Sequence, residues 1–214
     1  QQWFHREMGS AVAGLAAHRH IAPRCESILR VGGAPEAYVE VLRLLREAAD
    51  SGRWPGISPG REKVIKGQTL SENGGLGGSF SVGSMPPPLQ APAGNRLFPE
   101  LAARAFELEG LLLPGRPPSS TIAINKHAQF LPHVDSGAGA GQGVSLIVGL
   151  GDYAGGELVV EGSALDIRYT PVEFNGWTQR HWTLPFSGER FSLVWFTPLG
   201  CEGQPGLEVC RCNA

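Results

Sequence analysis

The chain has 214 residues, of which 42% are hydrophobic and 18% are charged, and its formal net charge is −2. This composition is typical of a globular protein that is long enough to bury one sizeable core. Proteins that bind nucleic acid mainly by neutralising phosphates are usually basic, so the charge excludes that class unless a local basic patch exists. No apolar run approaches the length of a membrane span, so we expect no membrane partner.

A local basic patch has four candidates in one stretch, and a solvated loop accounts for them equally well. They are Arg53, Arg61, Lys63 and Lys66. The sequence carries neither an initiator Met nor a signal-peptide pattern, so we expect a fragment of an intracellular, soluble protein.

The cysteines are too few and too unevenly spaced to predict a secreted disulfide framework. They are Cys25, Cys201, Cys210 and Cys212. The three in the tail can hold zinc if Cys25 or a histidine supplies a fourth ligand. Reduced thiols in a frayed tail are the favoured interpretation.

The first half of the chain predicts helices. Residues 8–20 are rich in alanine, and residues 35–50 carry apolar side chains at helical spacing with charged side chains opposite. Pro35 suits a first helical turn and Gly52 a helix end. A further helix is predicted over residues 99–109.

The segment from residue 51 to residue 95 is rich in glycine and proline and shows little periodicity, apart from a candidate strand at residues 63–70. A long irregular segment within a domain is typical of a lid or substrate loop. A disordered insertion is the equally weighted alternative.

From Ser119 onward the pattern changes to short strands bounded by glycine or proline. The predicted strands are residues 121–125, 145–150, 157–161, 166–169, 171–174 and 190–197. Helices followed by many short strands predict an α+β protein with a sandwich or jelly roll. We expect one domain, divided into a helical and loop-rich support region (1–118), a strand core (119–198) and a tail (199–214).

The motif His133-Val134-Asp135 is the first candidate for chemistry. Residues i and i+2 of an extended segment point to the same side, so this imidazole and this carboxylate converge. The pair alone is weak evidence, because H-x-D often occurs by chance. His181 follows after several predicted strands and supplies a third ligand. Two histidines and one carboxylate on one face leave coordination positions open, which suits Fe(II).

Arg190 is the second candidate. Turn residues at 184–188 predict a hairpin that folds a strand carrying His181 back onto a strand carrying Arg190. On that strand Arg190, Ser192 and Val194 share one face. An arginine on an apolar inward face is costly unless it is paired, and a bound carboxylate would remove that cost with help from the Ser192 hydroxyl. A surface arginine beside a glycine turn is the alternative.

These residues together resemble a known enzyme superfamily, the Fe(II)/2-oxoglutarate dioxygenases. The shared features are His133-x-Asp135, then His181, then Arg190-x-Ser192. The resemblance covers about residues 121–198. It implies a double-stranded β-helix (jelly-roll) core with N-terminal helices packed against it, and O2 as a substrate. It also implies that the two histidines and the aspartate ligate Fe(II), while Arg190 and Ser192 bind the distal carboxylate of 2-oxoglutarate.

A narrower resemblance points to the TET/JBP-like branch, whose members oxidise methylated pyrimidines. Residues 146–158 look like the segment after H-x-D in that branch, and residues 171–177 and 184–197 are similar to its compact algal members. It implies oxidation of 5-methylcytosine in DNA and a nuclear location. One algal relative uses ascorbate in place of 2-oxoglutarate, so ascorbate stays open as co-substrate or reductant. The sequence Gly-Gly-Glu-Leu at 155–158 also occurs in prolyl-hydroxylase-like enzymes.

Four neighbouring residues have two interpretations each. Asn125 either contacts the co-substrate or closes a strand end. Trp177, Trp182 and Lys126 are candidates for substrate contact, by stacking a flipped base in the case of the tryptophans, although packing is the commoner role. Two other functions stay open for the whole chain: a hydroxylase of a protein side chain or small molecule, and a non-catalytic, cupin-like metal-binding module.

Overall fold

The computed structural model describes residues 19–20, 33–56, 61, 63–66, 77–136 and 141–212. The helices are α1 (Glu36–Asp50), α2 (Gly94–Leu97), α3 (Pro99–Leu112) and α4 (Gly206–Cys212). The strands are β1 (Arg19–His20), β2 (Gly78–Gly83), β3 (Thr121–Lys126), β4 (Ser145–Leu150), β5 (Tyr153–Gly155), β6 (Leu158–Val160), β7 (Ser163–Leu165), β8 (Val172–Phe174), β9 (His181–Thr183), β10 (Phe186–Gly188) and β11 (Phe191–Phe196).

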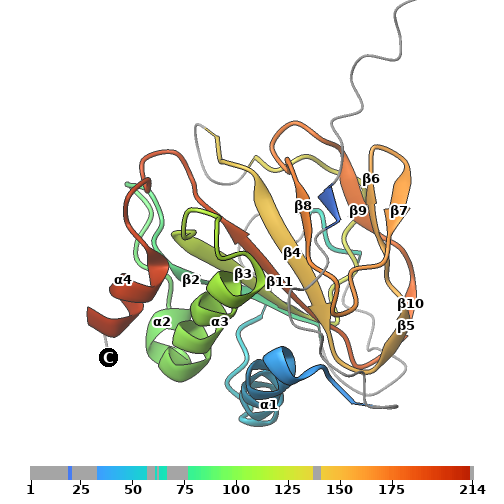
Figure 1. Ribbon diagram of the computed structural model, residues 1–214, viewed down its shortest axis with the longest axis horizontal. Helices are drawn as coiled ribbons and strands as arrows, with labels where there is room; N and C mark the ends of the chain where they lie inside the picture. The colour runs from blue at the N-terminus through green and yellow to red at the C-terminus, as the bar shows by residue number, and fades with distance from the viewer. Residues whose placement is uncertain are drawn as a thin grey trace, which may run out of the picture.

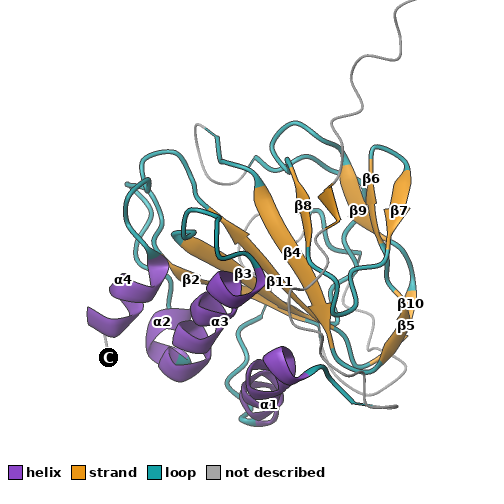
Figure 2. Ribbon diagram, viewed as in Figure 1, coloured by secondary structure: helices purple, strands orange, loops and turns teal. Residues whose placement is uncertain are grey.

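The strands form a large sheet and two small ones. The large sheet has the order β1-β8-β4-β11-β3-β2, and the small sheets pair β7-β6-β9 and β10-β5. Helices α1 and α3 lie on one side of the large sheet, whereas β6, β7 and β9 lie on the other side (Figure 1). Figure 2 shows the same separation, with the helices gathered at one end of the molecule and the small sheets at the other.

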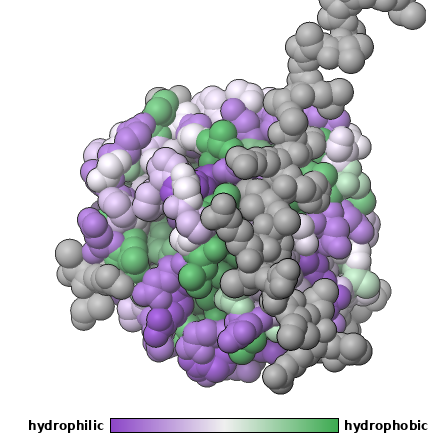
Figure 3. Space-filling model, in the orientation of Figure 1, coloured by the Kyte–Doolittle hydropathy of each residue, from purple (hydrophilic) through white to green (hydrophobic). Residues whose placement is uncertain are grey.

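Helices α1 and α3 form because their sequences favour helix and offer an apolar face to the sheet. Pro35 occupies the position before the first residue of α1, and Pro99 is the first residue of α3, where a missing backbone N–H costs nothing. The side chain of Leu45 in α1 is fully buried, while the outer side of α1 is strongly hydrophilic (Figure 3). Trp195 of β11, also fully buried, donates from Nε1 to the Ala105 carbonyl at 3.0 Å and ties α3 to the sheet.

The large sheet presents two different faces because side chains alternate along its strands. Ile124 of β3 and Leu193 of β11 belong to the core beneath the helices. Asn125 and Ser192 point to the opposite, inner face, where they are buried. A second core of Ile147, Leu158, Val160, Leu165, Ile167, Val172 and Phe174 fills the space between this inner face and the small sheet. The inner face is therefore apolar toward β8 and polar toward β3.

An ion-pair network ties α3 to the far edge of the large sheet. Arg116 contacts Glu109 of α3 and Glu173 of β8, each at 3.0 Å. It also donates to the Val144 carbonyl at 2.7 Å. Glu109 accepts a hydrogen bond from the Ser119 hydroxyl at 2.6 Å. Burial raises the pKa of Glu109, while its hydrogen bonds from Ser119 and the charge of Arg116 act in the opposite direction.

Several sequence predictions agree with these elements. The helices at 35–50 and 99–109 correspond to α1 and α3, and the strands at 121–125, 145–150 and 190–197 correspond to β3, β4 and β11. The predicted strand at 166–169 is wrong, because only an isolated bridge from Arg168 to Gly149 forms there. The helix predicted at 8–20 lies outside the described residues except for its end, where Arg19 and His20 form β1 instead. Residues 67–70 of the candidate strand at 63–70 also lie outside them.

The predicted hairpin between His181 and Arg190 is also wrong. Residues 186–188 form β10, which pairs with β5 rather than making a tight turn. As a result, β9 with His181 pairs with β6, whereas β11 pairs with β3 and β4. The two residues therefore come from opposing sheets.

The tail differs from the expected frayed segment, since residues 206–212 form α4 and Cys201 is a buried free thiol. Among the described helices, none combines the length and apolar character that a membrane crossing requires.

Candidate metal centre and co-substrate pocket

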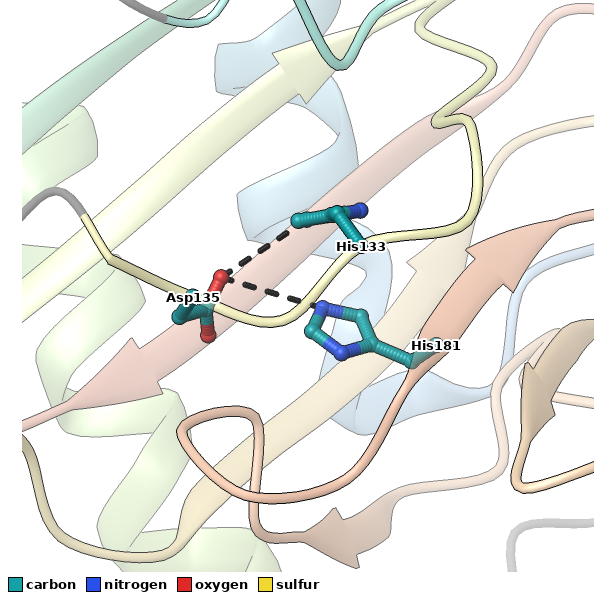
Figure 4. Close-up of side chains that lie close together, drawn as sticks. All are labelled: His133, Asp135 and His181. Carbon is teal, nitrogen blue, oxygen red and sulfur yellow. Dashed lines mark ion pairs between the residues drawn. The ribbon is translucent and has the colours of Figure 1, made fainter.

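The three predicted metal ligands come together. Ligand atoms of His133, Asp135 and His181 all lie within 4.8 Å of one another, a cluster that can hold a metal ion. Asp135 Oδ1 lies 3.7 Å from His133 Nε2 and 3.8 Å from His181 Nε2. Figure 4 shows the carboxylate facing both imidazoles, two of the side chains coming from one loop and the third from β9.

Backbone hydrogen bonds hold the loop carrying His133 and Asp135 against the β9 side of the site. His133 N donates to the His181 carbonyl at 3.0 Å, and His181 N donates to the His133 carbonyl at 2.8 Å. Two residues further on, Asp135 N donates to the Gly176 carbonyl at 2.8 Å. These bonds fix the positions of all three ligand-bearing residues without any contribution from their side chains.

Both imidazoles are oriented for metal binding. His133 Nδ1 lies 2.7 Å from the Leu131 carbonyl, and His181 Nδ1 lies 3.0 Å from the Gln179 carbonyl. A carbonyl can only accept, so each Nδ1 carries the proton and each Nε2 offers its lone pair. Burial lowers the pKa of His181, partly opposed by the charge of Asp135. A lowered pKa favours the neutral form that ligates metals.

The Asp135 carboxylate is positioned by two residues that the sequence analysis did not single out. Gln142 donates from Nε2 to Asp135 Oδ2 at 2.8 Å, which leaves Oδ1 directed at the imidazoles. Gly176 packs against the same carboxylate so closely that a Cβ at that position would lie 2.2 Å from Oδ2. Gln142 belongs to no motif recognised in the sequence, Gly176 lies in the stretch 171–177 without a role assigned to it, and only the fold brings them to Asp135.

Arg190 is buried between the sheets and is 1% exposed. Its Nη2 donates to the Gly156 carbonyl at 3.1 Å, and its guanidinium lies over the Phe186 ring at 5.1 Å and the Tyr153 ring at 5.4 Å. Within the described part of the chain, no carboxylate lies at ion-pair distance, and Arg190 Nε and Tyr153 Oη lack hydrogen-bond partners. Burial raises the pKa of Tyr153 to about 12, so its hydroxyl remains a donor.

A row of polar side chains crosses the inner face of the large sheet and ends on β11, the strand next to Arg190. Ser79, Asn125 and Ser192 are opposite one another on β2, β3 and β11. The Ser79 hydroxyl donates to Asn125 Oδ1 at 2.6 Å, and Asn125 Nδ2 donates to Ser192 Oγ at 3.2 Å. Arg61 reaches the far end of the row and donates from Nη1 to Ser79 Oγ. The row thus connects Arg61 with the strand that carries Arg190.

The predicted substrate residues lie in three different places. Trp177 follows Gly176 and is partly buried, with its ring near Gly141 and Leu199 on the Asp135 side of the site. Trp182 alternates with His181 along β9 and pairs with Val159, so its side chain points away from the ligand face. Lys126 lies on the helix-facing side of β3, where its Nζ is 5.4 Å from the Trp54 ring centroid. The structure therefore brings only Trp177 near the metal cluster.

The chemistry of this donor set fits an iron ion and an acidic co-substrate. Two neutral imidazoles and one carboxylate leave the remaining coordination positions of a metal ion free, as in the facial triad of non-haem Fe(II) oxygenases. A buried guanidinium without a carboxylate partner requires an anion, and Arg190 Nε and Tyr153 Oη are two free donors for it. Among the described residues, four buried side-chain polar atoms lack a hydrogen-bond partner, and two of them, Arg190 Nε and Tyr153 Oη, are donors suited to a bound carboxylate.

Comparison with known proteins supports the fold. No protein-family model matches the sequence, and no curated protein matches it significantly. Among solved structures, NgTET1 in complex with 5mC DNA is similar at a TM-score of 0.55 and 15% identity, over 80% of this chain and 71% of that one. A prolyl hydroxylase from Trichoplax adhaerens aligns at a TM-score of 0.49 and 13% identity, over 85% of this chain and 83% of that one. A 2OG-Fe(II) oxygenase family protein from Burkholderia pseudomallei aligns at a TM-score of 0.44 and 19% identity, over 73% of this chain and 79% of that one.

The likeness to NgTET1 extends over most of the chain, and the sheets that face each other across the metal cluster form the jelly roll that the sequence resemblance implied. This chain therefore has the double-stranded β-helix fold of the Fe(II)/2-oxoglutarate oxygenases.

Proposed function

We propose that this protein is an Fe(II)-dependent dioxygenase that couples O2 and 2-oxoglutarate to oxidation of a C–H bond. The observation that carries the proposal is the joint presence of two parts. One is the His133, Asp135 and His181 cluster. The other is the fully buried Arg190, which has no carboxylate partner among the described residues. A structural metal site alone does not require a buried cation of this kind.

Each residue has a defined task in this proposal. Bound Fe(II) supplies the activation of O2. The imidazoles of His133 and His181 hold the metal through Nε2, and Gln142 keeps Asp135 turned toward it. Arg190 and Tyr153 hold the distal carboxylate of 2-oxoglutarate, which orients the co-substrate toward the metal. The ring centroid of Phe174 lies 4.9 Å from that of His181, and the ring centroid of Phe130 lies 5.7 Å from that of His133. These aromatic rings limit the access of water to the imidazoles.

The proposal is tested by metal and product analysis. We expect the protein to bind one Fe(II) per chain under anaerobic conditions and to form succinate from 2-oxoglutarate when O2 is admitted. The substitutions His133→Ala and Asp135→Ala should remove both properties, because each deletes a ligand. Tight zinc binding with no succinate formation, or unchanged turnover in the two variants, would argue for a non-catalytic metal site instead.

Within this class we propose 5-methylcytosine in DNA as the substrate. Two observations support it: the resemblance of residues 146–158 to the TET/JBP-like branch, and the likeness of the fold to a protein solved with 5mC DNA. In this proposal Trp177, which follows Gly176 in the chain, would stack a flipped base. The net charge of −2 favours the alternative, a protein side chain or a small molecule.

Two tryptophans allow a matched test of this substrate. Stacking of a base on an aromatic ring contributes about 1–3 kcal/mol, so Trp177→Ala should raise the KM for methylated DNA roughly fivefold to 150-fold. Trp182→Ala serves as the control, because its side chain points away from the ligand face. The measurement is nucleoside mass spectrometry after incubation with methylated and unmethylated DNA. Succinate formation without any modified nucleoside would favour the other substrate classes.

A further inference from the structure

Two lysines lie beside the loop that carries His133 and Asp135 (Figure 4), and none of the roles above uses them. Lys63 and Lys66 belong to the basic stretch that the sequence offers as a local patch. Both are exposed, and among the described residues no carboxylate forms an ion pair with either. Their positive charges are therefore available to an anion from outside.

Main-chain contacts join the segment of these lysines to the metal centre. The Leu131 carbonyl lies 2.7 Å from His133 Nδ1, and the Leu131 N–H donates to the Val64 carbonyl at 2.6 Å. The Lys66 N–H in turn donates to the Gln129 carbonyl at 2.9 Å. The segment that carries the lysines thus runs antiparallel to the ligand-bearing loop, at one strand spacing of about 4.8 Å.

The ligand-bearing loop also exposes apolar side chains beside the metal cluster. Leu131 is 40% exposed, and Val134, between the two ligands of the loop, is 45% exposed. Of the three ligand side chains, that of Asp135 is the most accessible, at 31%, compared with 13% for His133 and 8% for His181. The cluster therefore reaches the surface on its Asp135 side, where apolar groups lie next to cations.

A surface of this composition fits a nucleic acid. A base that is extruded into a catalytic site leaves its flanking phosphates at the surface around that site. Lysine binds phosphate as a point charge and needs no shaped pocket for it, while exposed apolar side chains can contact bases and sugars. A local patch also suffices despite the net charge of −2, because charges farther away than the Debye length, about 8 Å at physiological salt, are largely screened.

We propose that Lys63 and Lys66 bind the DNA backbone next to the nucleotide that enters the metal centre, and that Leu131 packs against the neighbouring bases. The inference rests on the proposed function and assigns the surface that holds its DNA substrate. Phosphate contacts carry no sequence information, so the two lysines contribute equally to methylated and unmethylated DNA. Discrimination of the methyl group is left to the metal centre.

The salt dependence of DNA binding tests this surface. Fluorescence anisotropy of a labelled duplex, with or without 5-methylcytosine, would be measured on the Mn(II)-loaded protein between about 50 and 200 mM salt. Each phosphate contact adds about 0.9 to the slope of log affinity against log salt, so Lys63→Gln/Lys66→Gln should reduce the slope by about 1.8 for both duplexes. Leu131→Ala should weaken binding with an unchanged slope, because an apolar contact releases no counterions.

A second double variant provides the matched control. Arg53→Gln/Arg96→Gln removes the same two charges, from an arginine that lies over the Phe98 ring and from an exposed arginine on α2. Its slope should equal that of the wild-type protein. An unchanged slope in the lysine variant, or an equal change in both double variants, overturns the local patch. If the double lysine variant does not fold, each single variant should reduce the slope by about 0.9.

Poly-L-glutamate distinguishes DNA from an acidic protein as the partner. Binding of this polymer through the two lysines, without binding of either duplex, overturns the DNA assignment in favour of an acidic polypeptide. That result leaves the proposed dioxygenase intact. Absence of succinate formation from 2-oxoglutarate by the wild-type protein, which the anisotropy experiment does not measure, overturns the proposed function itself.

Discussion

Gly176 packs directly against the Asp135 carboxylate. Any Cβ there would lie 2.2 Å from Asp135 Oδ2, so Gly176→Ala must displace the carboxylate or the loop. Because misdirected ligands typically cost tenfold to a hundredfold in metal affinity, we expect a loss of roughly that size, measured by competition with a metal chelator. Gly110→Ala is the control, since nothing lies within 4 Å of its Cβ position. Equal metal affinity in both variants would mean that the site tolerates the methyl group.

At the scale of single residues, the sequence predicts the metal ligands better than the residues that position them. His133, Asp135 and His181 carry the spacing of a known motif, and alternation along β11 places Arg190 and Ser192 on one face. The supports have no such pattern. Gln142 and Arg61 reach the site from loops whose course depends on the tertiary structure, and a tyrosine three residues before Gly156 does not reveal that its hydroxyl will be buried beside an arginine.

At the scale of helices and strands, the ion pairs of Arg116 connect α3 with β8, and their contribution to stability can be tested. Arg116→Met leaves the buried Glu109 without its counter-charge, and breaking a buried pair costs about 3–5 kcal/mol. The cost should depend on pH. In the variant the folded-state pKa of Glu109 lies above the unfolded value. Protonated Glu109 therefore keeps the variant's stability at pH values below the unfolded-state pKa. This stability is lost as pH rises through the folded-state pKa of Glu109, because the buried carboxylate then becomes charged.

Urea denaturation at pH 5 and pH 8 measures this effect, with the larger destabilisation expected at pH 8. Arg104→Met provides the comparison, because the pair of Arg104 with Glu107 is exposed and should contribute little at either pH. A destabilisation of Arg116→Met that is equal at both pH values would show that Glu109 stays charged in the variant.

The elements themselves were predictable where their periodicity was long. α1 has fifteen residues of amphipathic pattern, and β3, β4 and β11 are bounded by clear breaks. The strands β5, β7 and β10 have three residues each, too few for a period to appear. The strands β6 and β8 are equally short and were predicted from their β-branched or aromatic residues and the bounding glycine or proline. The wrong hairpin follows from this limit, because Phe186 and its neighbours resemble a turn in sequence but pair with β5 in space.

For the whole molecule, the three proposed metal ligands join a loop to a strand of the small sheet, so metal binding should stabilise the fold. A ligand at a hundred times its dissociation constant stabilises the native state by about 2.7 kcal/mol. At about 2–4 °C per kcal/mol for a chain of this size, Mn(II) should raise the unfolding midpoint by roughly 5–10 °C. Asp135→Ala should show no such shift in differential scanning fluorimetry. An equal shift in that variant would place the stabilising ion elsewhere.

The paired backbone hydrogen bonds between His133 and His181 have a consequence for the kinetics of metal loading. Because these bonds join the main chain rather than the side chains, the two imidazoles are held close together before any ion arrives. Loading then orders little beyond the carboxylate of Asp135, so its entropic cost is small. In hydrogen–deuterium exchange, the amides of His133 and His181 should be protected equally with and without metal. Metal uptake would then proceed at a rate set by dehydration of the ion and its entry, and not by folding of the site around it.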